Sequence, residues 1–134
     1  MNVHAPRILE ANRRIIEQGA VDSIADYFSE SYIVVTGGIE RIGHEVIRGF
    51  TNQIHKSFSD LHVAVQILME ADSYIAWQRT TQGKQTGKFQ AFPATGLQIT
   101  WHDMVVSHFE DSLIAKEWVV TDMAEGLLRS RKSL

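Results

Sequence analysis

The sequence contains no cysteine, and only two of its 134 residues are proline. Without cysteine there can be no disulfide framework, thiolate zinc site, iron–sulfur cluster or cysteine nucleophile. No apolar run approaches the roughly 18 residues that a membrane span requires. Residues 1–14 are charged and lack the apolar core of a signal peptide. We therefore expect a soluble, cytoplasmic protein with no membrane partner.

The charge balance is mild, with 13 basic and 16 acidic residues and a net charge of −3. Such a balance gives no electrostatic reason to bind nucleic acid. The length is typical of one domain, which we expect to span residues 1–134. With 44% hydrophobic residues, the chain can build a core that needs neither disulfides nor metal.

Several common catalytic signatures are missing, including G-x-S-x-G, S-x-x-K and H-E-x-x-H. The six histidines do not form a metal-binding pattern either. His102 and His108 share one face of a predicted strand, but six residues place them roughly 20 Å apart, too far for one metal ion. We therefore expect no metal site.

Hydrophobic spacing predicts the order of the secondary structure. Helices are expected over 6–19, 21–28 and 43–58, a short strand over 32–35, longer strands over 61–69, 74–81, 99–109 and 113–120, and a final helix turn over 122–129. Helices followed by four consecutive antiparallel strands are typical of an α+β fold. Such a sheet can curve around the helices, and the hollow between them is the expected ligand site.

Two residues near the C-terminus suggest acid/base chemistry. His108 alternates with Met104 on one face of its strand, and Asp122 shares a face with Trp118 on the next strand. If that face points inward, Asp122 lies at the rim of the hollow, where desolvation would raise the pKa of its carboxyl group towards a catalytic range. Pairing about the turn at Asp111 would place His108 opposite residue 114 or 115, so contact with Asp122 needs a shifted register or a bend.

Each of these residues also has a structural interpretation. Asp122 followed by Glu125 fits a capping box at the start of a helix, and His108 can be an ordinary strand histidine. Arg79, in the middle of a strand, needs an anionic partner if it faces inward and is solvated if it faces outward. Asn52 lies off the apolar stripe of its helix, towards solvent or a helix–sheet edge.

Several sequence stretches together resemble the SnoaL-like polyketide cyclases of the nuclear-transport-factor-2-like superfamily, over roughly residues 5–130. The stretches are F-S-D-L-H at 58–62, I-A-W-Q-R-T at 75–80, T-G-K-F at 86–89, F-P-A-T-G at 92–96, and I-A-K-E-W at 114–118 with Asp122 after it. The P-x-T-G loop and the W-x-x-x-D pattern are the strongest of these.

The resemblance implies a cone of helices on a curved antiparallel sheet with an internal apolar pocket. It also implies intramolecular aldol cyclisation without metal or cofactor. Asp122 matches the family's acid/base, and His108 matches an assisting histidine fourteen positions earlier. Asn52 falls near a pocket asparagine of the family.

From the residues themselves we expect Trp118, Arg79 and Met104 to contact the substrate. The chain departs from the family pattern at Ile16, where tyrosine is expected, and at Val105, where an aromatic residue is expected. Both changes would make the pocket more apolar.

The resulting hypothesis is a cofactor-free enzyme for a small hydrophobic carbonyl compound, which it cyclises or isomerises. The alternative is a non-catalytic binding or dimerisation module of the same fold. An epoxide hydrolase is disfavoured because Thr81, two residues after Arg79, offers no carboxylate. We expect a homodimer formed through the convex face of the sheet. A raised pKa of Asp122 would favour catalysis, and an ordinary one would favour capping.

Overall fold

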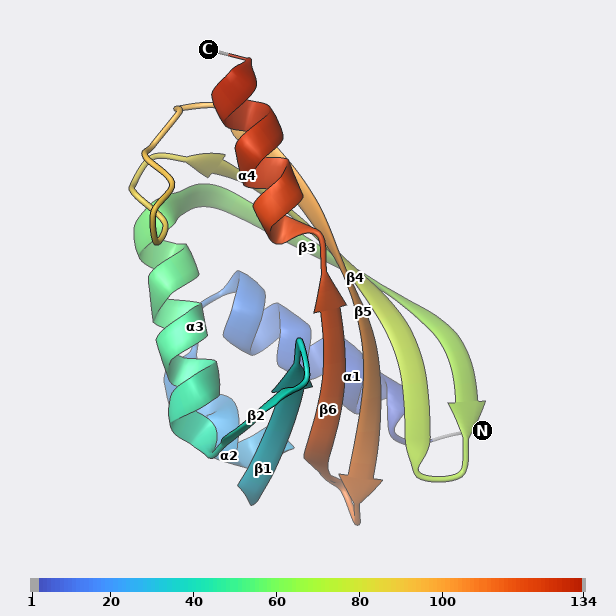
Figure 1. Cartoon of the computed structure of the whole chain (residues 1–134). Coiled ribbons are helices and arrows are strands. Elements are labelled where there is room, and N and C mark those ends of the chain that lie inside the picture. Colours follow the sequence, from blue (N-terminus) through green and yellow to red (C-terminus); the bar gives the residue numbers. More distant parts are fainter. Residues whose placement is uncertain (1–2, 134) are drawn as a thin grey trace.

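A computed structural model describes residues 3–133 of the chain (Figure 1). The elements in chain order are α1 (Ala5–Ala11), a π-helical segment (Asn12–Glu17), a 3₁₀ turn (Val21–Ser23), α2 (Ile24–Tyr27), β1 (Phe28–Thr36), β2 (Ile39–Ile42), α3 (His44–Ser57), β3 (Phe58–Ala71), β4 (Tyr74–Gln85), β5 (Gln98–Glu110), β6 (Leu113–Thr121) and α4 (Met123–Lys132). Within residues 3–133, no helix is both long and apolar enough to cross a membrane.

The six strands form one mixed sheet in the order β2-β1-β6-β5-β4-β3. The four strands from β3 to β6 pair antiparallel in succession, as the sequence predicts. β1 joins the edge of this meander in parallel with β6, and β2 pairs with β1 as a short hairpin. The α+β prediction is confirmed, but β2 and the parallel pairing were not predicted.

The N-terminal helices lie against one side of this sheet. α1 begins with Pro6 in its first turn, where the missing amide proton of proline costs little. The predicted helix over 6–19 is α-helical only as far as Ala11 and then continues as the π-helical segment to Glu17, and Gly19, with a positive φ of 74°, follows its end. π-Helical turns often occur at functional sites. This segment buries Asn12, Ile15 and Ile16.

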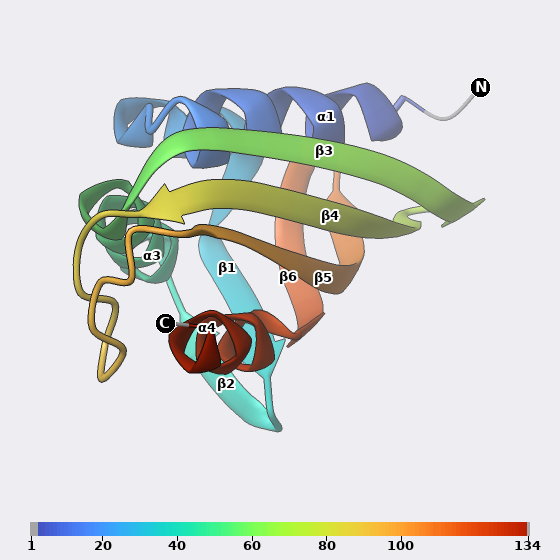
Figure 2. The same ribbon diagram turned by 90° about the horizontal axis from the view of Figure 1, so that it is seen from above.

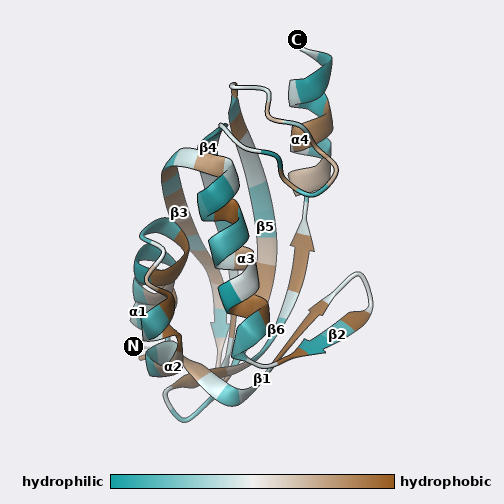
Figure 3. Ribbon diagram, turned by 90° about the vertical axis from the view of Figure 1, so that its left-hand side faces the viewer, coloured by the Kyte–Doolittle hydropathy of each residue, from teal (hydrophilic) through white to brown (hydrophobic). Residues whose placement is uncertain are grey.

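The sheet bends strongly around α1 and α3, as Figures 1 and 2 show from two directions. α3 alternates hydrophilic and hydrophobic residues along its turns (Figure 3), and its buried positions include Ile47 and Ile54. α4 packs closely on β5 at Gly126. A Cβ atom at this position would lie only 3.1 Å from the carbonyl oxygen of Thr100. Glycine therefore permits this approach.

The inward face of the sheet is set by the alternation along β5. Its odd-numbered residues from Ile99 to Phe109 are buried, whereas His102, Met104 and Val106 are exposed. Successive strand residues point to opposite faces, so the odd-numbered set faces the helices and the even-numbered set forms the convex outer face. This assignment decides which predicted residues can reach an internal site.

Candidate functional site

A cavity of about 600 Å³ lies between the concave face of the sheet, the π-helical segment and α3. Aromatic side chains make up much of its wall, including Phe28, Phe50, Trp77, Phe89 and Trp101. Exposed residues from β1, β2, α3 and β6 also line it and mark its mouth; they are Thr36, Arg41, Glu45 and Thr121. A cavity of this size holds a small organic molecule.

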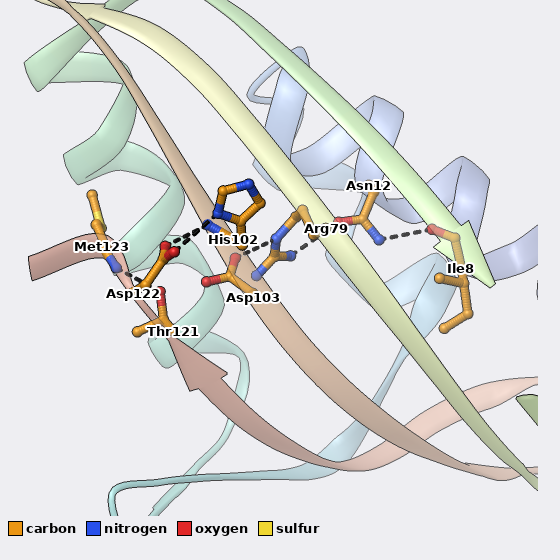
Figure 4. A network of polar contacts seen from close by, with 8 residues as sticks. All are labelled: Ile8, Asn12, Arg79, His102, Asp103, Thr121, Asp122 and Met123. Carbon is orange, nitrogen blue, oxygen red and sulfur yellow. Dashed lines mark hydrogen bonds and ion pairs between the residues drawn. The ribbon is translucent and has the colours of Figure 1, made fainter. Parts of the chain in front are cut away.

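Arg79 lies inside this cavity between two partners (Figure 4). Its Nε donates a hydrogen bond to Oδ2 of Asp103 at 2.8 Å, and its Nη1 donates to Oδ1 of Asn12 at 2.9 Å. Asn12 in turn donates to the carbonyl oxygen of Ile8 at 2.9 Å. The guanidinium also lies 5.4 Å from the centre of the Trp77 ring, within cation–π range. Arg79 thus faces inward and has the anionic partner that such a position requires.

Asp103 supplies that anion, and one of its two carboxylate oxygens accepts no hydrogen bond from residues 3–133. Its side chain is only 4% exposed and lines the cavity. Oδ2 is held by Arg79, and among residues 3–133 no donor hydrogen-bonds to Oδ1. A buried carboxylate is tolerated when a cation balances its charge. Arg79 provides this balance through Oδ2, which leaves Oδ1 as an available acceptor beside the cavity.

A second polar group involves Glu117 of β6. The hydroxyl of Tyr32 donates to its Oε1 at 2.7 Å, and the hydroxyl of Ser107 donates to its Oε2. Ser107 accepts a hydrogen bond from Nε1 of Trp77 at 2.9 Å. Burial raises the pKa of Glu117, although the bonds from Ser107 and Tyr32 and the charge of Arg79 act in the opposite direction.

The structure corrects the expected positions of Asp122 and His108. His108 belongs to the outward-facing set of β5, Asp122 follows β6 and pairs with His102 of that set, and neither lines the cavity. Nδ1 of His108 hydrogen-bonds Ser73 at 3.2 Å, and its ring stacks on Tyr74 with 4.4 Å between centroids. Asp122 instead pairs with His102, at 2.9 Å between Oδ2 and Nδ1 (Figure 4). Since His102 and His108 are six strand residues apart, the two expected partners lie roughly 20 Å from each other.

The environment of Asp122 also differs from the one expected. Its side chain is 46% exposed. Partial burial acts to raise the pKa of the carboxyl group, but hydrogen bonds from the backbone amide and ring of His102, with the charges of His102 and Arg129, lower it on balance. Asp122 occupies the position before α4, yet its side chain makes no capping hydrogen bond to the helix. The capping-box interpretation is therefore wrong as well.

Three expected substrate contacts also lie outside the cavity. Met104 is 48% exposed, and Trp118 lies on the same outer face beside Lys116, whose Nζ is 5.0 Å from the ring centre. Asn52 is exposed on α3, whereas the next residue, Gln53, lines the cavity. Of the expected contact residues, Arg79 alone lines it.

The strand register separates His108 from Asp122. Residue Ala115 is an extra residue on β6, so His108 pairs with Lys116 instead of residue 114 or 115. Asp103 and Glu117 have the same fourteen-residue spacing as His108 and Asp122, but they face inward. Sequence reasoning missed both, together with Asn12 and Tyr32. The available signal was a polar residue on the same strand face as a large aromatic one, as for Asp103 and Trp101 in the stretch W-H-D-M-V-V-S at 101–107.

No three His, Cys, Asp or Glu side chains within residues 3–133 lie close enough together to hold a metal ion. No protein with a curated description matches the sequence significantly. Among solved structures, the chain superimposes on TsrD from Streptomyces laurentii with a TM-score of 0.85 and 19% identity, covering 100% of this chain and 98% of that one.

Two further structures carry functional descriptions. AclR from Streptomyces galilaeus, a proposed hydroxylase, gives a TM-score of 0.80 at 21% identity over 96% and 98% of the two chains. A SnoaL-like polyketide cyclase from Agrobacterium tumefaciens gives 0.77 at 20% identity over 98% and 99%. At these identities the similarity concerns the fold. The family model for SnoaL-like polyketide cyclases matches residues 6–129, nearly the whole sequence. The chain therefore belongs to the SnoaL-like polyketide cyclase family.

Proposed function

We propose that this protein is an enzyme that binds a small hydrophobic carbonyl compound in the cavity and removes a proton beside the carbonyl group, with Asp103 as the base. One observation carries the proposal. Asp103 is a buried carboxylate at the cavity wall with Oδ1 available and Oδ2 held by Arg79. A general base needs a free acceptor atom within reach of the substrate proton, and the position of Oδ1, without a hydrogen bond at the cavity wall, supports this role.

The chemistry uses only side chains of this chain. Oδ1 of Asp103 accepts a proton from a carbon next to the carbonyl group, and the electron pair of the broken C–H bond moves into the enolate. The positive charge of Arg79 lies beside the base and favours the developing negative charge. The enolate can then attack a second carbonyl carbon of the same molecule, and the alkoxide formed takes the proton back from Asp103 to give an aldol ring. If the enolate is conjugated with a C=C bond, it can instead regain that proton at the far carbon, which shifts the double bond.

The walls support a hydrophobic ligand. Trp77 and Trp101 are buried, and Ile15 and Ile16 line the cavity from the π-helical segment. Such walls exclude water, and exclusion of water strengthens the electrostatic effect of Arg79 on a nearby enolate. Positioned acid/base catalysis of this type contributes on the order of 10²–10⁴-fold.

The test measures proton exchange and does not require the natural substrate. Aryl alkyl ketones are incubated with the protein in heavy water, and loss of the proton next to the carbonyl group is followed by NMR. Asp103→Asn should lower the enzyme-dependent exchange rate by two to four powers of ten, roughly the contribution of a positioned base. Asp122→Asn tests the rival assignment on the outer face, and we expect its rate to stay within about twofold of the wild type.

Two results would contradict the proposal. If Asp122→Asn abolished exchange and Asp103→Asn did not, the base would be on the outer face. If ketones quenched the fluorescence of the buried tryptophans but no exchange occurred, a ligand-binding module without catalysis would be supported instead. Circular dichroism of both variants controls for loss of folding.

A further inference from the structure

The proposed reaction leaves the polar group around Glu117 without a role. Glu117 and Tyr32 both line the cavity, and both are buried. Ser107, the register partner of Glu117, is four strand residues from Asp103, roughly 13 Å along the backbone. Val105 and Val119, also register partners, lie between the two acidic residues. The cavity wall therefore carries two acidic residues at different positions along the strands, with Val119 between them.

The hydrogen bonds of Glu117 limit what its neighbours can do. Tyr32 and Ser107 each have one hydroxyl proton, and each donates it to one oxygen of this carboxyl group. While Glu117 is ionised, both protons are used and neither hydroxyl can donate to a ligand. If Glu117 is protonated, its own O–H can donate to the oxygen of Tyr32, and the Tyr32 proton becomes available to the cavity.

The protein surroundings of Glu117 favour its protonated form more than solvation by water would. Burial raises the pKa of Glu117, and burial with the charge of Glu117 raises the pKa of Tyr32 well above its ordinary range, so the phenol remains a donor. The charged groups facing the same cavity are Arg79 from β4, Asp103 from β5, Arg41 from β2 and Glu45 from α3. Of these, Arg79 acts on Glu117 and opposes the effect of burial, while Asp103 pairs with Arg79.

We propose that Tyr32 and Glu117 form a switchable hydrogen-bond donor that binds a carbonyl oxygen of the ligand. In the active form, protonated Glu117 donates to the oxygen of Tyr32, and Tyr32 donates to the ligand. This inference depends on the proposed function in one respect only, namely that the ligand contains a carbonyl group. It assigns recognition of a carbonyl oxygen to the end of the cavity away from Asp103, and it makes that recognition depend on pH.

The test measures binding and requires no turnover. The probe is a propionyl-dimethylaminonaphthalene dye, a hydrophobic aromatic ketone whose emission moves to longer wavelength when its carbonyl oxygen accepts a hydrogen bond. Binding is titrated from mildly acidic to alkaline pH. In the wild type we expect tight binding with shifted emission at low pH, and affinity that falls roughly three- to tenfold as Glu117 ionises, the value of one hydrogen bond.

Two variants separate the donor from a merely structural role. Glu117→Gln cannot ionise; its amide can donate to Tyr32 while its carbonyl accepts from Ser107. Its affinity should match the low-pH wild type at every pH. Tyr32→Phe keeps the buried ring but removes the proton, so its affinity should be low at every pH. Glu110→Gln, at an exposed position at the end of β5, is the matched control and should keep the pH dependence of the wild type.

The outcomes that would overturn the proposal are distinct. Tyr32→Phe with wild-type affinity and emission, Glu117→Gln with the pH dependence of the wild type, or no saturable dye binding to the wild type would each do so. If Glu117→Gln does not fold, Tyr32→Phe decides alone, because the loss of one hydroxyl proton must remove both the emission shift and the pH dependence. If the dye binds with the expected pH dependence but the protein catalyses no proton exchange, the proposed function is rejected and this inference still holds.

Discussion

Arg79 and Asp103 face each other across β4 and β5 as register partners, and their side chains form an ion pair inside the cavity. Both side chains are largely removed from water, with 13% and 4% exposure. Removing one partner of such a pair leaves an uncompensated buried charge, whereas replacing both with apolar groups is often tolerated. Stability and the proposed catalysis therefore place different demands on the same two residues.

The first prediction follows from this difference. Arg79→Met should lower the free energy of unfolding by about 3–5 kcal/mol, and the double variant Arg79→Met with Asp103→Leu should recover most of that loss. Urea unfolding of both variants measures the effect. Lys84→Met, at an exposed position on β4, is the control and should change stability by less than about 0.5 kcal/mol. A double variant as unstable as the single one would show that the pair is not the cause.

The second prediction concerns stability and pH. The pKa of Glu117 is raised in the folded protein, above an ordinary value of about 4.3 in the unfolded chain. The folded state then binds the proton more tightly, so this contribution to stability is complete below the ordinary pKa and is lost as the pH rises through the raised one. Urea unfolding at a series of pH values should show the wild type losing stability relative to Glu117→Gln over that interval. A constant difference between the two would contradict the raised pKa.

The third prediction concerns a contribution to stability that changes with pH in the opposite direction. The pKa of Asp122 is lowered in the folded protein, so its contribution to stability is present above the ordinary value of about 3.9 and is lost as the pH falls through the lowered one. Asp122→Asn should destabilise the protein at neutral pH by less than about 1 kcal/mol, because the pair with His102 is half exposed. Thermal unfolding at neutral and acidic pH checks this, and a deficit that persists at acidic pH would point to another cause.

The fold was largely predictable because apolar periodicity follows directly from packing. The alternation over residues 99–109 and the helical stripe over 43–58 correspond closely to β5 and α3. β2 was missed because Ile39–Ile42 is short and exposed along its whole length, so it carries no burial pattern. β4 extends past Thr81 to Gln85, and at Gly83 the absence of a side chain lets β3 pack close, because a Cβ there would lie 2.9 Å from Leu61.

The site was harder to predict because strand alternation gives two faces without saying which is inside. On β5 the outward face carries Met104 and Val106, while the inward face carries Asp103 and Ser107. The inward face also carries Ile99, Trp101, Val105 and Phe109, so the rule that apolar residues are buried selects the correct face of β5 but does not indicate that polar residues on it have a role. The inward polar residues are stabilised by partners on other elements, such as Arg79, and such pairings depend on a register that the sequence does not display.

The apolar residues on the outward face lead to the last prediction. Met104 pairs with Val120 and Val106 pairs with Trp118 across β5 and β6, and all four are exposed. Tyr74 extends this group, with its ring centre 6.4 Å from that of Trp118. Contiguous exposed apolar residues of this kind mark interaction sites more often than scattered ones do. We propose that a second copy of the chain covers this face, sheet against sheet, to form a homodimer.

Val106→Glu tests this arrangement, because a twofold interface brings the substituted position of one copy close to apolar residues of the other. Buried, unpaired carboxylates should weaken association at least a hundredfold, a cost of several kcal/mol, and light scattering should then report a monomer where the wild type is a dimer. Leu9→Glu adds the same charge at an exposed apolar position on α1 and should leave the dimer intact. A wild type that remains monomeric at high concentration, or a Leu9→Glu variant that dissociates equally, would show that the convex face is not the interface.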